Sequence, residues 1–525
     1  MGGDLFPPIF FELPPNNPRY LNIRFEAILN YLSMHKKLSF LLAMLLFSCF
    51  TQAQTVEDAL RYSSFEPSGT ARFMATGGAL GPLGADLSVT GTNPAGIALY
   101  RTSEFTITPA LFNASTNAQL TAVQDISKDG RTNLNFHNIG VVMTSQPIAR
   151  KWKSLNMAIT LNNVGNFNRQ LSYQGRTTGS ISQRWQELAN DPNVGLNNFE
   201  AGIAFDAGAI YDIDDNPDDY EIDYEGFEDQ LLDKSQTVIN RGGISELSFA
   251  FGANYNERVM IGLSIGLPIL NFEYDSQYSE TDEKSPSGGN VPYLESLEYN
   301  DKYTTTGGGI NAKLGVIVRA SQALRIGGAV HTPTAYNLED EFETELINNY
   351  FADPDESGDF VGGEAESTGL FEYRMQTPWR FFGGAGLILG KNGFISGEVE
   401  LVDYNSNTFK FDGFDDGELA VNGDIAQRLT SVVNLRLGGE FVYDDFRFRL
   451  GFGTFPSAFV ADDTRRNSLS AGAGYRRNRI FLDLAYRYTS YDEFFFPYFT
   501  DTAVLQEVQT EYSLNRLLFT FGVKF

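Results

Sequence analysis

Apolar and polar side chains alternate, residue by residue, through one stretch of this chain after another. At 246–255, 258–267, 446–453 and 480–488, every second residue is Leu, Ile, Val, Phe, Tyr or Ala. Successive side chains of a β-strand point to opposite faces, so each stretch predicts a strand with one apolar face and one polar or small face. This repeated pattern restricts the chain to folds that are built mainly from long antiparallel strands.

The order of these stretches predicts how the sheet is closed. We expect strands near 103–113, 134–145, 155–168, 244–255, 258–272, 303–320, 323–335, 371–389, 393–409, 430–443, 445–455, 467–477, 479–490 and 512–525. The connections between them alternate between long (114–133, 169–243) and short (146–154, 256–257), and the last, 491–511, is long. Bacterial outer-membrane barrels have an even number of strands, long outer loops and short periplasmic turns. We therefore predict an all-β fold, a 14-stranded antiparallel transmembrane β-barrel over 103–525, with both ends in the periplasm and 169–243 as the largest extracellular loop.

The last strand and the charged side chains agree with a barrel in the bacterial outer membrane. Leu517, Phe519, Phe521, Val523 and the terminal Phe525 alternate with Leu518, Thr520, Gly522 and Lys524, as is typical of outer-membrane chains. Several charged residues fall on the polar faces of their strands: Glu398, Glu400, Arg436, Glu440, Arg447, Arg449, Asp483 and Arg487. A charge facing lipid costs about 2–4 kcal/mol at the bilayer midplane, so these side chains should face the lumen. Opposite signs on neighbouring strands predict a cross-strand ladder of ion pairs.

The beginning of the chain predicts export. An apolar stretch from Leu38 to Phe50 follows Lys36 and Lys37, and it is too short to span a bilayer as a helix. It leads to a small-x-small site, so we expect a signal peptide at 34–53 with translation starting at Met34. Residues 1–33 are then a mis-assigned upstream extension. The alternative is a lipoprotein site at the single cysteine, Cys49, although Phe47 fits such a site badly.

Composition and short motifs argue against catalysis, cofactors and metals. With 66 acidic and 39 basic residues the net charge is −27, so no basic surface for nucleic acid is expected. Asp212–Pro217 resembles the start of a calcium loop but has Pro217 in place of the required glycine. Gly262–Gly266 matches a G-x-S-x-G nucleophile motif, yet it falls within an expected strand instead of at a sharp turn. Gly390–Gly393 resembles a phosphate loop only faintly, and we expect a hairpin turn there.

Two histidines remain after the expected cleavage. Haem ligation by His137 or His331 is an alternative to a structural role, but no cluster of His, Cys and carboxylates suggests an enzyme or a metal site. We therefore predict no catalytic residue, no bound metal and no cofactor.

The segment 54–102 lacks strand alternation and is rich in Gly, Ala and Pro. Small residues allow close backbone packing, and Asn-Pro begins a turn. We therefore expect this segment to plug the lumen. Its most distinctive residues, in the order G-x-A-R…G-G-A…A-D…N-P-A-G, include Arg72, Gly77, Gly78, Asp86, Asn93, Pro94, Ala95 and Gly96.

This order of residues resembles the N-terminal hatch of the FadL/TodX family of outer-membrane transporters for hydrophobic compounds. The stretches 162–169, 331–334 and 377–380 are similar to its Bacteroidetes branch. The resemblance covers 55–525 and implies a fourteen-stranded barrel, a hatch, and substrate that leaves sideways through a gap in the wall. Long-chain fatty acid is the family's default substrate. The intensely acidic run from Asp212 to Asp229 departs from the family pattern, because it does not suit capture of an anionic fatty acid.

Two functions follow from these observations. The first is passive uptake of a hydrophobic small molecule, with an inward arginine pairing with a ligand carboxylate. The candidate arginines are Arg325, Arg380, Arg436, Arg449 and Arg487. The second is a structural subunit of an outer-membrane assembly or secretion complex, for which the acidic loops would dock other envelope proteins. In either case the expected surroundings are outer-membrane lipids and lipopolysaccharide.

Overall fold

The structure, a computed structural model, describes residues 55–148, 151–192, 194–212, 219–283, 290–351, 362–501 and 503–525. The expected upstream extension (1–33) and signal peptide (34–53) lie outside these residues. So does 213–218, which holds most of the calcium-loop resemblance.

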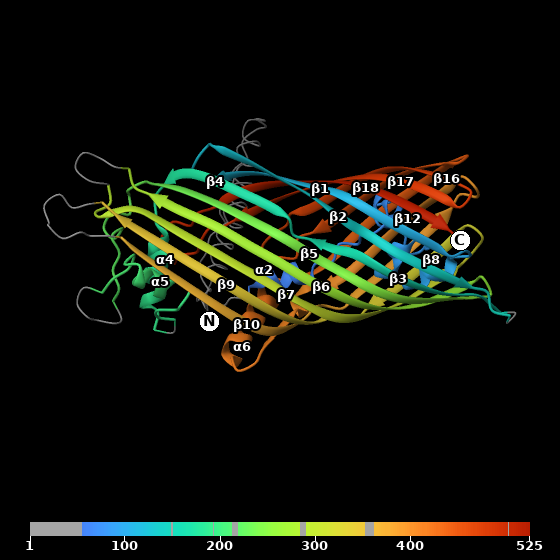
Figure 1. Cartoon of the computed structure of the whole chain (residues 1–525), viewed down its shortest axis with the longest axis horizontal. Helices are drawn as coiled ribbons and strands as arrows, with labels where there is room; N and C mark the ends of the chain where they lie inside the picture. The colour runs from blue at the N-terminus through green and yellow to red at the C-terminus, as the bar shows by residue number, and fades with distance from the viewer. Residues whose placement is uncertain are drawn as a thin grey trace, which may run out of the picture. The chain divides into compact units, whose positions relative to one another are not determined.

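Antiparallel strands form the wall, and β18 pairs with β1 to close the barrel (Figure 1). The strand segments in chain order are β1 (Glu104–Leu120), β2 (Ile126–Ser145), β3 (Trp152–Asn166), β4 (Arg169–Thr177), β5 (Leu232–Tyr255), β6 (Val259–Thr281), β7 (Leu294–Arg319), β8 (Leu324–His331), β9 (Ala335–Tyr350), β10 (Gly363–Gln376), β11 (Arg380–Ile388), β12 (Gly393–Asp403), β13 (Thr408–Phe411), β14 (Ser431–Tyr443), β15 (Phe446–Pro456), β16 (Arg465–Arg477), β17 (Ile480–Phe495) and β18 (Val508–Lys524). Four strands of the wall are interrupted, namely β3/β4, β8/β9, β10/β11 and β12/β13, so the barrel has 14 strands. The fold predicted from the alternation is confirmed.

Several strands extend further from the short turns than the alternation predicts. The connection expected at 169–243 is shorter, because β4 pairs with the first part of β5 and leaves 178–231 between them. The expected 114–133 connection is mostly strand as well, with 121–125 joining β1 to β2. The outer face of the extension carries polar residues such as Glu339, Glu341 and Glu343 of β9. Because these portions have no apolar outer face, they lack the apolar–polar alternation that predicts the other parts of the strands.

Short turns join the strands at the opposite end of the barrel. Asn256 and Glu257 between β5 and β6 have φ values of 52° and 55°, and Asp444 and Asn478 adopt the same left-handed conformation at two other turns. Tight hairpins favour this conformation because its twist matches that of the flanking strands. Apolar side chains such as Ile261, Leu263 and Ile265 on β6 are exposed on the outer face near these turns, which is where contact with lipid is expected.

The helices lie in the N-terminal segment and in the longer connections. Helices α2 (Val56–Ser63) and α3 (Ala71–Ala75) and the 3₁₀ helices η1 (Leu87–Gly91) and η2 (Pro94–Leu99) precede β1. The connections contain α4 (Ile181–Asn190), α5 (Ala201–Asp206), η3 (Tyr404–Ser406) and α6 (Asp415–Arg428). Across the described part of the chain, every helix is too short or too polar to cross a bilayer.

The N-terminal segment packs against the inner side of the wall. Helix α3 contacts β15 to β18, whereas η2 contacts β3, β5, β6 and β7, which are on another part of the barrel. Helix α2 contacts α6 and joins a cluster of buried apolar and aromatic residues that includes Tyr62, Phe272 and Phe409. The segment is drawn in blue among the strands of Figure 1. We call residues 55–102 the hatch segment from here on.

Candidate functional site

The hatch segment holds its own shape through caps that its sequence supplies. Thr70 begins α3, and its hydroxyl accepts a hydrogen bond from the Phe73 amide at 3.2 Å and donates one to Asp86 at 2.9 Å. Asp86 in turn caps η1, accepting from the Ser88 amide at 3.1 Å and the Ser88 hydroxyl at 2.7 Å. Such caps satisfy amides that the first turn of a helix leaves without partners. The buried Thr70–Asp86–Ser88 group therefore joins α3 to η1 without help from the wall.

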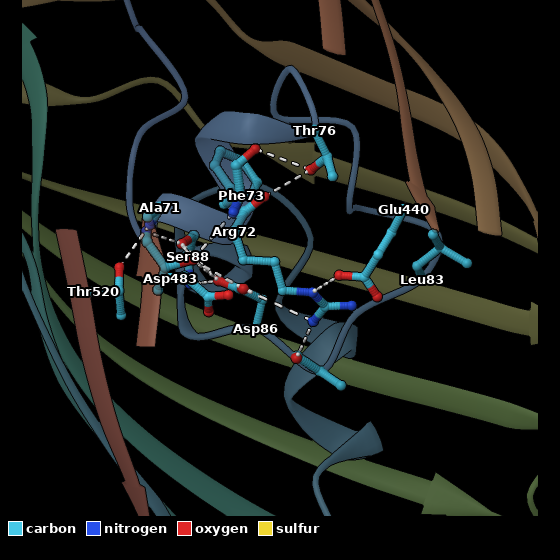
Figure 2. A network of polar contacts seen from close by, with 12 residues as sticks. Ala71, Arg72, Phe73, Thr76, Leu83, Asp86, Ser88, Glu440, Asp483 and Thr520 are labelled. Atoms are coloured by element: carbon cyan, nitrogen blue, oxygen red, sulfur yellow. Dashed lines mark hydrogen bonds and ion pairs between the residues drawn. The ribbon is translucent and has the colours of Figure 1, made fainter. Parts of the chain in front are cut away.

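Arg72 connects this network to the barrel wall. Its Nε donates to Glu440 of β14 at 3.2 Å, and its Nη1 donates to the Ala85 carbonyl at 2.9 Å (Figure 2). The Asp86 carboxylate lies 3.9 Å from the same Nη1 atom. The predicted hatch residues Arg72 and Asp86 therefore lie together, and Arg72 links two hatch turns to one strand.

Glycines allow the hatch backbone to approach the wall closely. Gly77 and Gly78 have φ values of 63° and 81°, which favour glycine over other residues. Opposite them, a Cβ on Gly438 or Gly451 would collide with the backbone of Thr76 or Gly77. These wall glycines, on β14 and β15, therefore form a shallow seat for the turn after α3.

The Asn93–Gly96 turn is seated in the same way on another sector. The Asn93 side chain accepts from the Ala95 amide at 3.2 Å and donates to the Val316 carbonyl of β7 at 3.3 Å. A Cβ on Gly262 of β6 would collide with the backbone of Pro94 and Ala95. The G-x-S-x-G motif at 262–266 lies within β6, as predicted, and its first glycine makes room for the hatch.

Two of the candidate arginines belong to one buried group of charges. Arg436 on β14 donates to Glu398 and to Glu400 of β12, each at 3.0 Å. Arg380 donates to the other oxygen of Glu400 at 2.6 Å and also contacts the Ser63 carbonyl of the hatch segment. Two arginines thus face two carboxylates. We call these four residues the β12–β14 ion-pair group.

A second group lies beside Arg72. Arg449 donates to Glu440 at 2.7 Å and to Asp483 at 2.6 Å. Glu440 and Arg449 are directly opposite in the pairing of β14 with β15, and so are Glu398 and Arg436 on β12 and β14. The predicted cross-strand ladder is therefore present in this sector.

Among the described residues, the two remaining candidate arginines, Arg325 and Arg487, do not pair with a carboxylate of the wall. Arg325 donates to the Leu83 carbonyl of the hatch segment at 2.7 Å. Arg487 lies directly opposite Arg516 in the pairing of β17 with β18, so two like charges face each other. The hatch residue Glu66 joins them, 2.6 Å from Arg516 and 3.6 Å from Arg487. A ligand carboxylate contact stays a prediction for all five candidates, and in this structure the four other than Arg325 have carboxylates of the chain as partners.

Sequence reasoning did not identify Glu66 or Arg516. Arg516 continues the inward-facing series of Leu518, Thr520 and Gly522, so its direction was available from the alternation. Burial by itself would raise the pKa of the Glu66 carboxyl, but the guanidiniums of Arg516 and Arg487 outweigh this effect and hold the pKa well below its usual range. Glu66 is therefore ionised at neutral pH, as its two partners require.

The backbone hydrogen bonding of the wall is interrupted between β2 and the next strand, which consists of β3 and β4. β2 pairs with β3 only from Asn138 to Ser145, while the rest of β2 pairs only with β1, and β4 pairs only with β5. Asp129 of β2 reaches β4 by its side chain, accepting from the Ser172 amide at 2.7 Å. The interruption begins after Asn162, four residues before β3 ends, within the 162–169 stretch. Hatch residues lie beside it, because the Glu66 amide donates to the Val164 carbonyl at 3.0 Å.

The two histidines have different surroundings. His331 Nε2 lies 2.7 Å from the Thr92 carbonyl, and its ring contacts Phe65 and Phe382. His137 is buried, and neither ring nitrogen has a hydrogen-bond partner among the described residues. Those residues also contain no group of three or more His, Cys, Asp or Glu arranged to hold a metal ion.

Comparison with known proteins places this architecture among solved barrels. No protein-family model matches the sequence, and no curated protein matches it either. A FadL homologue from Pseudomonas aeruginosa superposes with a TM-score of 0.51 at 12% identity, covering 88% of this chain and 100% of that chain. The Pseudomonas putida toluene transporter TodX gives a TM-score of 0.50 at 11% identity, covering 88% and 99%. At such low identity these similarities establish a shared fold.

Proposed function

We propose that this chain is an outer-membrane channel of the FadL/TodX family for passive uptake of hydrophobic compounds. Long-chain fatty acids are the default substrate class, and the Bacteroidetes branch fits the motifs at 331–334 and 377–380. Residues 34–53 would direct export, and the exposed apolar strand faces would contact outer-membrane lipids, with lipopolysaccharide around the long loops. The hatch segment would gate the lumen.

One observation carries the proposal: the wall ladder between β2 and β3 ends at Asn138–Asn162, and a hatch residue is bonded to the strand at that place. In an uninterrupted barrel every backbone group of the wall is paired, which is required in lipid. An interruption beside the hatch offers an apolar molecule a sideways route from the lumen to the bilayer. The fold shared with a FadL homologue and with TodX supports this interpretation.

The experiment is to lock the hatch to the wall and measure uptake. Thr90 of η1 and Thr160 of β3 have their hydroxyl oxygens 2.7 Å apart, so a T90C/T160C pair is within reach of a disulfide. The only natural cysteine, Cys49, lies in the expected signal peptide and would be absent from the mature chain. We expect the wild-type chain in outer-membrane vesicles to take up radiolabelled palmitate, the oxidised variant to lose uptake, and reduction to restore it.

The single variants T90C and T160C are the matched controls and should transport in either redox state. Unchanged uptake by the fully oxidised pair would show that hatch movement is not required. Failure of the wild-type chain to raise uptake of palmitate, hexadecanol or toluene above that of empty vesicles would contradict the proposed function itself.

A further inference from the structure

One row of inward-facing residues crosses five neighbouring strands along the direction of their hydrogen bonds. Cross-strand pairing places Ser470, Arg487, Arg516, Phe112 and Asn133 side by side on β16, β17, β18, β1 and β2. The row ends at the part of β2 that has no partner on its other side. It therefore runs from the charged wall of the lumen to the interruption in that wall.

The two arginines of this row are short of negative charge. Like charges directly opposite each other on neighbouring strands are destabilising. Arg487 and Arg516 are 3% and 5% exposed, and among the described residues Glu66 is the one carboxylate paired with either of them. The β12–β14 ion-pair group, by contrast, has as many carboxylates as arginines. We call Arg487 and Arg516 the arginine fork.

Polar atoms without partners surround the arginine fork. The hydroxyl of Ser470 and an N–H of the His137 ring can donate to an anion, whereas the side-chain carbonyls of Asn133 and Asn135, also without partners, can only accept. The Nε atoms of Arg487 and Arg516 are also unpartnered. Buried polar groups normally have hydrogen-bond partners, and a cluster of exceptions indicates a missing one.

Aromatic rings orient the arginine fork. The Arg516 guanidinium lies over the Phe112 ring at 5.1 Å, and that of Arg487 lies over the Phe455 ring at 5.9 Å. A guanidinium held on a ring keeps its edge available for two parallel hydrogen bonds to one carboxylate. The surroundings therefore suit an anionic head group attached to an apolar body.

Glu66 belongs to the hatch and not to the wall. Its amide donates to Val164 at the interruption between β2 and β3, and the Ser68 hydroxyl donates to the neighbouring Asn163 carbonyl. One short stretch of the hatch segment thus contacts both the arginine fork and the edge of the interruption. A change at the Glu66 side chain therefore falls within three residues of both hydrogen bonds to the edge of β3.

We propose that the arginine fork is a binding site for the carboxylate of an amphipathic ligand, and that Glu66 is an internal occupant which the ligand displaces. This inference rests on the proposed function, because it assigns the head-group site to the same uptake path. A ligand carboxylate takes the place of the Glu66 carboxylate on Arg516 and Arg487. The freed Glu66 stretch can then leave the edge of β3, so that binding and opening of the sideways route are coupled.

The test measures binding of palmitate and of hexadecanol, which has the same chain length but no carboxylate, to the full chain in nanodiscs. In the E66Q variant the competing charge is absent, so palmitate affinity should rise about tenfold or more, while hexadecanol affinity changes little. In R516Q, palmitate should lose affinity relative to hexadecanol. The matched control is E257Q, which removes a similar ion-paired carboxylate from a turn outside the lumen.

The outcomes separate the two proposals. Equal palmitate affinity in E66Q and the wild type, with normal hexadecanol binding, would overturn the arginine-fork proposal and leave hydrophobic uptake standing. A gain for both compounds in E66Q would also overturn it, because loosening of the hatch would then be sufficient. If no variant binds either compound, the proposed function fails and the arginine-fork proposal fails with it. Hexadecanol binding by E66Q reports whether the variant is folded, so a folding defect is distinguished from a head-group effect.

Discussion

Two sectors of the lumen use buried arginines in opposite ways. Across β12, β14 and β15, the two fully buried arginines are each directly opposite a carboxylate of the wall, Arg436 with Glu398 and Arg449 with Glu440. Across β17 and β18, Arg487 faces Arg516, and their shared carboxylate comes from the hatch segment. In the first sector wall carboxylates pair with the wall arginines and the hatch residue Arg72 adds a further partner for Glu440, whereas in the second sector the hatch supplies the carboxylate that the two arginines share. We infer from this difference that the ion pairs of the first sector stabilise the wall, whereas Arg487 and Arg516 bind a carboxylate that can be displaced.

The largest expected effect is on stability in the first sector. Replacing Arg436 by Met leaves the buried Glu398 without its ion-pair partner and removes one of two partners from Glu400. Loss of one member of a buried ion pair typically costs about 3–5 kcal/mol. We expect the free energy of unfolding of Arg436→Met to fall by about that amount, as measured by urea titration in lipid vesicles with tryptophan fluorescence. A loss below about 1 kcal/mol would show that this sector is not a stabilising ladder.

A smaller effect, of opposite sign, is expected when negative charge is added to the second sector. Ser470 is buried directly opposite Arg487, and its hydroxyl has no partner in the described structure. Ser470→Asp should raise the free energy of unfolding by about 1 kcal/mol, because hydrogen bonds to charged groups contribute about 1.5–3 kcal/mol and desolvation offsets part of this. The urea titration in lipid vesicles measures this change in the free energy of unfolding.

The matched control for that change is Ser396→Asp. Ser396 is also buried and faces the lumen, but its hydroxyl donates to the Ala79 carbonyl at 2.6 Å. An aspartate there places an acceptor against an acceptor and should destabilise the barrel by about 2 kcal/mol. Destabilisation of similar size by both aspartates would remove the distinction between the sectors.

The third prediction concerns Arg487 itself. In Arg487→Met, Glu66 keeps Arg516 as its partner, and the repulsion between two facing arginines is lost. We expect the free energy of unfolding to change by less than about 1 kcal/mol. The informative comparison is with Arg436→Met under identical conditions. A loss as large as that of Arg436→Met would mean that both sectors are structural to the same degree.

The smallest effect is a dependence on pH. The folded-state pKa of Glu66 is held below its ordinary value of 4.5, so the contact with Arg516 is fully formed above that pH and is lost as pH falls further. The difference in unfolding free energy between the wild type and E66Q should therefore be constant from pH 8 to about pH 5 and shrink below about pH 4. A difference that shrinks between pH 8 and pH 6 would show that Glu66 titrates near neutrality and is not held by the arginine fork.

The sequence predicts the wall well because the signal is local. Alternation identifies which side of each strand faces lipid, and residues such as Leu263 and Arg449 lie on the expected faces. The polar outer extensions of β5, β9 and β10 were missed because both of their faces contain polar residues. These extensions are recognised only from their backbone pairing with neighbouring strands.

The candidate site was predictable only in part, for a related reason. The face of Arg487 follows from its own strand, but its neighbour depends on the register between β17 and β18, which are joined by the long connection 496–507. The place of Glu66 depends on the path of the hatch segment, which has no repeating pattern. The Gly, Asn and Pro positions of the hatch were identifiable because tight turns require them, whereas a lone glutamate in a loop has no such signature.

The most direct measurement for the central claim is hydrogen exchange along the hatch segment of the full chain in nanodiscs, with and without palmitate. We expect faster exchange at 64–69 when palmitate is bound, because Glu66 leaves the arginine fork and its amide leaves Val164. Exchange at 71–78, which is held by the contact of Arg72 with Glu440 and by the glycine seat on β14 and β15, should stay slow. Unchanged or slower exchange at 64–69 with palmitate bound would show that the ligand does not displace Glu66 from the arginine fork.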